Sequence, residues 1–123
     1  MPHITVEYTH DLQEQIEINQ LLPLIHETLL SHEGVFSASG IRSRGVMIAD
    51  YFRGGDNAPI EDGFVHVILK ILTGRSEDVK QKVLNHLLEV INNHLTEYCG
   101  HKNVALSIEL FEFNSAGNMY VQN

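Results

Sequence analysis

Three arginines are the side chains in this sequence best suited to chemistry. Arg42 and Arg44 stand one residue apart, Arg75 follows a glycine, and Arg53 is the only other arginine. A guanidinium group stays cationic at any working pH and binds carboxylates through paired hydrogen bonds. The pattern favours a small acidic ligand. The plainer alternative is that these arginines are surface residues in weak ion pairs with some of the sixteen acidic side chains.

Pro2 has two very different chemical readings. Behind Met1 its nitrogen is an amide without basicity, but removal of Met1 would leave a free secondary amine. An α-amino group titrates near ~7.7–8.0, and burial beside arginines would disfavour its charged form. Pro2 is therefore a candidate general base near neutral pH, and the alternative is an ordinary second residue.

The other reactive residue types do not form a recognisable site. The eight histidines contain no HExxH motif, and Cys99 has no second thiol to pair with, so no metal site and no disulfide is predicted. His66, inside an apolar run, is expected to be a hydrogen-bonded core or interface residue, while His86 and His94 fit the solvent side of a helix. Cys99 is expected to be a small packed residue.

The first half of the chain reads as strand, helix, strand. Apolar residues alternate from Pro2 to Tyr8, the period of a half-buried strand. Asn19 is a candidate cap for a helix over 20–32, with Pro23 in its first turn and Gly34 as its stop. An extended stretch follows over 41–52. Side chains repeat every two residues in a strand, so Arg42 and Arg44 should share one face.

The second half repeats this order after a turn-rich connection over 54–59. A nearly continuous apolar run over 64–72 predicts an interior strand. Ser76 is a suitable cap for a second helix, and an apolar stripe runs from Val79 to Leu95. A last strand is expected over 104–113, and the tail over 114–123 is expected to form a short edge or intersubunit strand.

The passage Gly74-Arg75-Ser76 lies where the third strand should hand over to the second helix. The free N–H groups and dipole at a helix start suit an anion. The alternative is a turn glycine, an incidental arginine and a helix cap.

Two tandem β-α-β units predict an α+β (α/β) fold: one four-stranded mixed sheet with two helices on one face. The pseudo-repeats span about 2–52 and 64–113 of a single domain, 1–123, with a short C-terminal tail. The face without helices would still carry Phe64, Ile68 and Leu72. Uncovered apolar area of this kind usually marks an interface, so a closed homo-oligomer is expected.

Charge and hydropathy exclude two classes of partner. The formal net charge of −8 would repel a phosphate backbone at long range, so nucleic acid is not expected. No apolar run approaches the roughly 20 residues of a membrane helix, and the chain opens without a secretory signal. A soluble, cytoplasmic protein without a membrane partner is expected.

Together, several motifs resemble one family. An N-terminal Met-Pro-His-Ile-x-Val-Glu, the Gly-Ile-Arg-Ser-Arg run at 40–44, and Phe-Val-His-Val at 64–67 leading to Gly-Arg-Ser at 74–76 occur in one order over almost the whole chain. They resemble the 5-carboxymethyl-2-hydroxymuconate Δ-isomerase family of the tautomerase superfamily. The passage from the third strand into the second helix is also similar to a single unit of the shorter 4-oxalocrotonate tautomerase.

The resemblance implies a proton shift that needs no cofactor. Pro2 would be the catalytic base, and Arg42 and Arg75 would bind a small anionic dienol and draw electron density from it. Arg44, on the same face as Arg42, is carried over as a further substrate contact. The resemblance also implies a homotrimer with its sites near subunit interfaces.

Two other readings remain open from sequence. One keeps the amine and the arginines but acts on another small 2-hydroxydienoate or decarboxylates a 2-oxo acid. The other is a non-catalytic oligomeric module whose arginines bind an acidic metabolite or form salt bridges. Retention of Met1 in the native host would favour the second.

Overall fold

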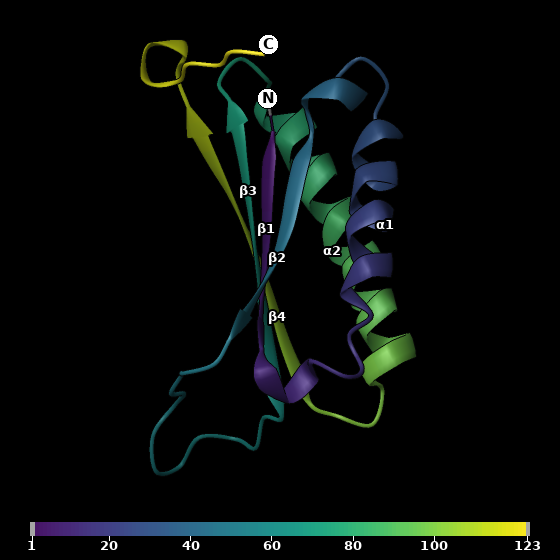
Figure 1. The fold of residues 1–123 in the computed structure, drawn as a ribbon, viewed down its shortest axis with the longest axis vertical. Coiled ribbons are helices and arrows are strands. Elements are labelled where there is room, and N and C mark those ends of the chain that lie inside the picture. The colour runs from purple at the N-terminus through teal and green to yellow at the C-terminus, as the bar shows by residue number, and fades with distance from the viewer. Residues whose placement is uncertain (1, 123) are drawn as a thin grey trace.

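The computed structural model describes residues 2–122 and contains six main elements (Figure 1). In chain order they are β1 (His3–Thr9), α1 (Ile18–Leu30), β2 (Arg42–Ile48), β3 (Gly63–Leu72), α2 (Glu77–Cys99) and β4 (Val104–Phe113). Single 3-10 turns follow β1 at His10–Leu12, precede β2 at Ala38–Gly40 and follow β4 at Ser115–Gly117.

One four-stranded sheet joins the two halves in the order β2-β1-β3-β4. β1 pairs with β2 in parallel and β3 with β4 in parallel, whereas β1 and β3 run antiparallel at the centre. The expected pair of β-α-β units and the mixed sheet are therefore confirmed. β3 is interior to the sheet, as its apolar sequence indicates.

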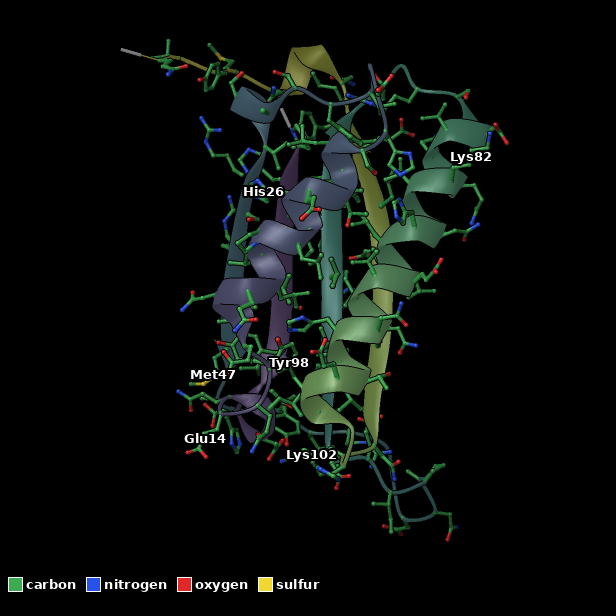
Figure 2. The ribbon with its side chains drawn as sticks, turned by 90° about the vertical axis from the view of Figure 1, so that its right-hand side faces the viewer. Glu14, His26, Met47, Lys82, Tyr98 and Lys102 are labelled. Carbon is green, nitrogen blue, oxygen red and sulfur yellow. The ribbon has the colours of Figure 1, made fainter. Side chains whose placement is uncertain are left out.

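Both helices cover the same face of the sheet and leave the other face open (Figure 1, Figure 2). The helix side of β1 and β3 is fully buried, as shown by Ile4, Val6, Val65 and Val67. The residues between them point to the open side and are only partly buried. The expectation of apolar residues on an uncovered face is thus confirmed for the single chain, although β3 is covered on one face only. Within residues 2–122 no helix is long and apolar enough to span a bilayer.

The first helix begins two residues earlier than predicted. Glu17, in a left-handed conformation with φ of 50°, offers its carbonyl to the N–H groups of Gln20 and Leu21. Asn19 is therefore not the cap but lies inside the first turn, and Pro23 lies inside the helix rather than at its start. The helix also ends at Leu30, before the expected stop.

Buried anchors in the segment before this helix explain the earlier start. Leu12 and Ile16 are 0% exposed, and the Ile16 carbonyl lies 2.7 Å from the Nε2 atom of His94 on α2. His94 is 5% exposed, so its predicted place on the solvent side was wrong. Its ring satisfies a buried carbonyl that would otherwise lack a partner.

Two segments that were expected to be extended, 41–52 and the tail, differ in the structure. β2 stops at Ile48 instead of Phe52 because its only neighbour, β1, ends at the paired residue Thr9. Beyond it the chain forms a loop in which Arg53 pairs with Glu61 at 2.8 Å. The described part of the tail, 114–122, has one 3-10 turn and no strand, so the predicted edge strand is absent there. Cys99 is buried, as expected.

Leu12 provides a test of this anchoring. Leu12→Ala should lower the free energy of unfolding by about 2–5 kcal/mol, because a fully buried leucine leaves a cavity when truncated. Urea denaturation measures the change. Leu88→Ala, at a side chain that is 40% exposed, is the matched control and should cost less than half as much. Equal losses would show that the 3-10 turn does not anchor the core.

Candidate active site

Pro2, Arg42 and Arg75 lie at one end of the sheet. β1 and β2 begin there and β3 ends there, because β1 is parallel to β2 and antiparallel to β3. Pro2 is buried, and its carbonyl accepts a hydrogen bond of 3.0 Å from the backbone N–H of Arg42. Figure 1 shows the start of β1 at this end of the sheet. Met1, whose removal would expose the proline nitrogen, lies outside the described residues.

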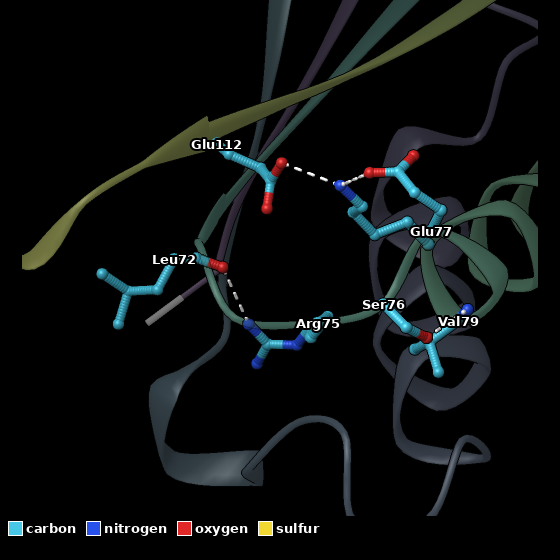
Figure 3. A network of polar contacts seen from close by, with 7 residues as sticks. Leu72, Arg75, Ser76, Glu77, Val79 and Glu112 are labelled. Carbon is cyan, nitrogen blue, oxygen red and sulfur yellow. Dashed lines mark hydrogen bonds and ion pairs between the residues drawn. The ribbon is translucent and has the colours of Figure 1, made fainter.

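Arg75 is held in the turn between β3 and α2. Gly74 has φ of 125°, a left-handed conformation that favours glycine and turns the chain out of the sheet. The Arg75 guanidinium donates to the carbonyl of Leu72 at 3.1 Å and to that of Val35 at 2.7 Å, and it stacks over Phe36 at 4.8 Å. Figure 3 shows the contact with Leu72.

The helix that follows is fixed by its own polar contacts. Ser76 accepts the Val79 N–H at 3.2 Å, which confirms the predicted cap. Lys80 bridges Glu77 in the same turn and Glu112 near the end of β4 (Figure 3). The Lys80 pKa is raised, chiefly by the hydrogen bond to Glu112. These contacts tie the first turn of α2 to the sheet, so Arg75 has a rigid frame on both sides.

The Arg75 guanidinium has further N–H groups that could donate hydrogen bonds to a ligand. A guanidinium has five N–H donors, and two of them are used in the contacts described. Its Nε atom is buried and lacks a hydrogen-bond partner within residues 2–122. A carboxylate offers the paired acceptors that such a group binds best.

Arg42 and Arg44 share a strand face, as predicted, but their side chains take different directions. The register places them opposite His3 and Thr5. Arg42 turns to the loop before β2 and donates to the carbonyl of Ser39 at 2.8 Å. Arg44 crosses to β1, where it lies 2.9 Å from the Nδ1 atom of His3 and 3.4 Å from the Thr5 hydroxyl. Arg44 therefore lies on the open face of the sheet, two residues further along β2 than Arg42.

His3 reports the positive potential of this region. Burial lowers its pKa below the ordinary value of 6.5, and the nearby charges of Arg44, Arg42 and Lys70 lower it further. A neutral His3 ring accepts the hydrogen bond from Arg44. The same cations would disfavour protonation of any amine placed beside them.

Val35 and Phe36 are the functional-site residues that sequence reasoning missed. They support Arg75 from a segment 40 residues away, through a backbone carbonyl and an aromatic face. The only local signal is Gly34, whose φ of 78° marks a turn. A carbonyl has no sequence signature, so this contact could not be predicted.

His66 lies away from the end of the sheet that holds Pro2 and Arg75. His66 lies on the open face, with Nδ1 2.6 Å from the Ser107 hydroxyl and Nε2 3.2 Å from Glu109. The predicted hydrogen bonding of His66 is therefore confirmed, but the side chain is 29% exposed in the single chain and does not lie in the core. Across residues 2–122, no three histidine, cysteine or carboxylate side chains gather closely enough to hold a metal ion.

Known proteins resemble this chain over its full length. A family model described as 5-carboxymethyl-2-hydroxymuconate isomerase matches residues 2–123. The 5-carboxymethyl-2-hydroxymuconate Delta-isomerase of Escherichia coli is 32% identical over 123 residues, which is 100% of this chain and 95% of that protein.

Solved structures agree with the sequence comparison. The crystal structure of a 5-carboxymethyl-2-hydroxymuconate isomerase from Deinococcus radiodurans R1 matches with a TM-score of 0.87 and 34% identity, over 99% of this chain and 90% of that one. A fused 4-OT symmetric trimer matches with a TM-score of 0.60 and 18% identity, over 98% and 93% of the two chains, and supports the fold alone. Because the family match spans the described chain and isomerases of this kind share both its sequence and its fold, the chain belongs to the 5-carboxymethyl-2-hydroxymuconate isomerase family and is an isomerase.

Proposed function

We propose that the protein converts 5-carboxymethyl-2-hydroxymuconate into its 2-oxo-3-ene isomer, with Pro2 as the base. The observation that carries this proposal is the buried start of β1 at the same sheet end as the fixed Arg75 guanidinium. The substrate is the one named for the family and for the relatives that match the full chain.

Pro2 becomes the base once Met1 is removed. Its secondary amine takes the proton of the 2-hydroxyl group, and the oxygen's electrons form the C2 carbonyl. The double bonds shift to place the alkene at C3, and C5 receives a proton from the prolinium. The proline ends as it began, so no cofactor is required. Burial and nearby cations favour the uncharged amine that can start the cycle.

The arginines bind the substrate's carboxylates and stabilise developing charge. Arg75 has unused N–H donors and a fixed orientation, so it can bind one carboxylate through paired hydrogen bonds. Arg42, beside the carbonyl of Pro2, serves the oxygen end of the dienol, where negative charge develops. Arg44 is the further substrate contact on the open face.

The assembly that we propose is a homotrimer of single-domain subunits with sites near the subunit interfaces. The open sheet face carries half-buried apolar and charged side chains that a neighbouring copy would cover. The setting is cytoplasmic breakdown of homoprotocatechuate, an aromatic acid derived from 4-hydroxyphenylacetate. Neither nucleic acid nor a membrane has a part in this function.

Removal of the proline amine tests the mechanism. Protein that retains Met1 has only an amide nitrogen at Pro2 and should lose about 10²–10⁴-fold in kcat, the usual contribution of a general base. Pro2→Ala replaces the secondary amine by a primary one in a changed position and should lower kcat by less; intact mass verifies both forms. An ultraviolet assay of the muconate dienol measures turnover. Pro59→Ala, in the loop before β3, is the control and should match the parent. Unchanged turnover in both altered forms would defeat the mechanism.

Arg75→Ala tests the carboxylate contact. The acidic substrate should lose about 10- to 100-fold in kcat/KM, the worth of a hydrogen bond to a charged group. A neutral ester analogue should lose much less. Arg53→Ala, whose side chain pairs with Glu61 in a remote loop, is the matched control. Sedimentation should show an unchanged assembly, and equal loss with acid and ester would exclude the contact.

A further inference from the structure

Two histidines that the proposed mechanism does not use form a contact between the two halves. His32 follows the end of α1, and its Nε2 atom lies 2.9 Å from the Nδ1 atom of His86 on α2. Their ring centroids are 5.1 Å apart with an edge-to-face geometry. Both side chains are partly buried. At this distance one neutral imidazole donates an N–H and the other accepts it.

A short chain of hydrogen bonds runs from this histidine pair to Arg75. The carbonyl of His32 accepts the N–H of Val35 at 3.2 Å, and Gly34 between them has φ of 78°, which together describe a tight turn. The carbonyl of Val35 then accepts from the Arg75 guanidinium at 2.7 Å, and Phe36 packs under the same group.

The other histidine is attached to the same frame. His86 belongs to α2, which begins at Glu77, two residues after Arg75. The His32–His86 contact therefore links the turn over 32–35 to α2, which begins two residues after Arg75. If the contact opens, the Val35 carbonyl and the Phe36 ring lose one of their fixed supports.

We propose that His32 and His86 are positioning residues, which hold the turn that orients Arg75 and weaken substrate binding when both rings are protonated. The proposal rests on the proposed role of Arg75 in binding a carboxylate. It adds a pH-sensitive element to the site without assigning either histidine to the reacting atoms.

The electrostatics of the pair give the sign of the effect. One proton can be shared between the rings, but two protons leave two donors, two positive charges and no acceptor. Burial, and then the charge of His86, lower the pKa of His32 below 6.5. The unfolded chain therefore binds this proton more readily, so the free energy of unfolding should fall as the pH drops below 6.5.

Burial and the charge of His86 account for the lowered pKa of His32. Glu33 adjoins His32, and Lys82 and Glu89 stand one turn to either side of His86 on α2; all three are exposed. Lys82 is paired with Asp78 at 3.1 Å. The fully buried side chains of β3, on the sheet face that the helices cover, are apolar, among them Leu69 and Ile71. The second proton therefore meets mainly the other imidazolium.

Three variants separate positioning from general stability. His86→Leu removes the hydrogen-bond partner of His32 and should raise KM about 3- to 10-fold at pH 7.5, the effect of losing one neutral hydrogen bond, with little change in kcat. His86→Asn keeps an oxygen near the position of Nδ1 but cannot be protonated. It should keep the parent's KM at pH 7.5 and remove most of the rise in KM that the parent shows at pH 5.5.

Tyr98→Phe is the matched control. Tyr98 on α2 donates to Gln20 on α1 at 2.8 Å, so it also links the helices, but at the opposite end of α2 from Lys82 (Figure 2). It should leave KM and its pH dependence unchanged. A parent-like KM in His86→Leu, or an equal rise in Tyr98→Phe, would overturn the proposal.

An NMR measurement that does not depend on turnover separates this proposal from the proposed function. The Arg75 Nε–H signal in a ¹⁵N NMR spectrum, assigned by its loss in Arg75→Lys, should move between pH 7.5 and 5.5 in the parent and stay in place in His86→Asn. Inactivity toward the muconate dienol with this pH response intact would refute the substrate and keep the positioning pair. A signal that moves equally in both proteins would refute the pair.

Discussion

Two backbone carbonyls that hold one guanidinium connect the halves of this protein at the end where Pro2 begins. The Leu72 carbonyl ends β3 in the second half, and the Val35 carbonyl follows α1 in the first half. Arg75 donates to both, so its position depends on both units at once. In its proposed role of binding a carboxylate, Arg75 would gain from this support, because its orientation is fixed before the ligand arrives and less freedom is lost on binding.

β3 and β4 could be predicted well because they depend on local apolar patterns, whereas the early end of β2 depends on where its neighbour β1 ends. β4 matches its expected bounds, and β3 differs by one residue at its start. The start of α1 could not be predicted in this way. The carbonyl of Glu17, rather than the side chain of Asn19, accepts the first hydrogen bonds of the helix. The position of the helix start depends on the burial of Leu12 and on the contact of Ile16 with His94, which is distant in sequence, so no local pattern predicts it.

The charged residues of the candidate site could be predicted from the sequence, but the contacts that orient their side chains could not. The spacing of Arg42 and Arg44 placed them on one face, and the register agrees. Their different directions depend on the Ser39 carbonyl and on His3, which sequence does not bring together. The His32–His86 contact joins residues 54 positions apart, and only the packing of the two helices reveals it.

The net charge of −8 makes these local supports more important. An anionic substrate is repelled by the whole molecule at long range, but salt screens exposed charges beyond about 8 Å at physiological ionic strength. Attraction must then come from cations within contact distance. Arg42, Arg44, Lys70 and Arg75 all lie on the strands or turns near Pro2, and the first three shift the pKa of His3. In the proposed function the binding energy depends on how well a few cations are oriented, so the segments that orient Arg75 would contribute to affinity although they carry no charge of their own.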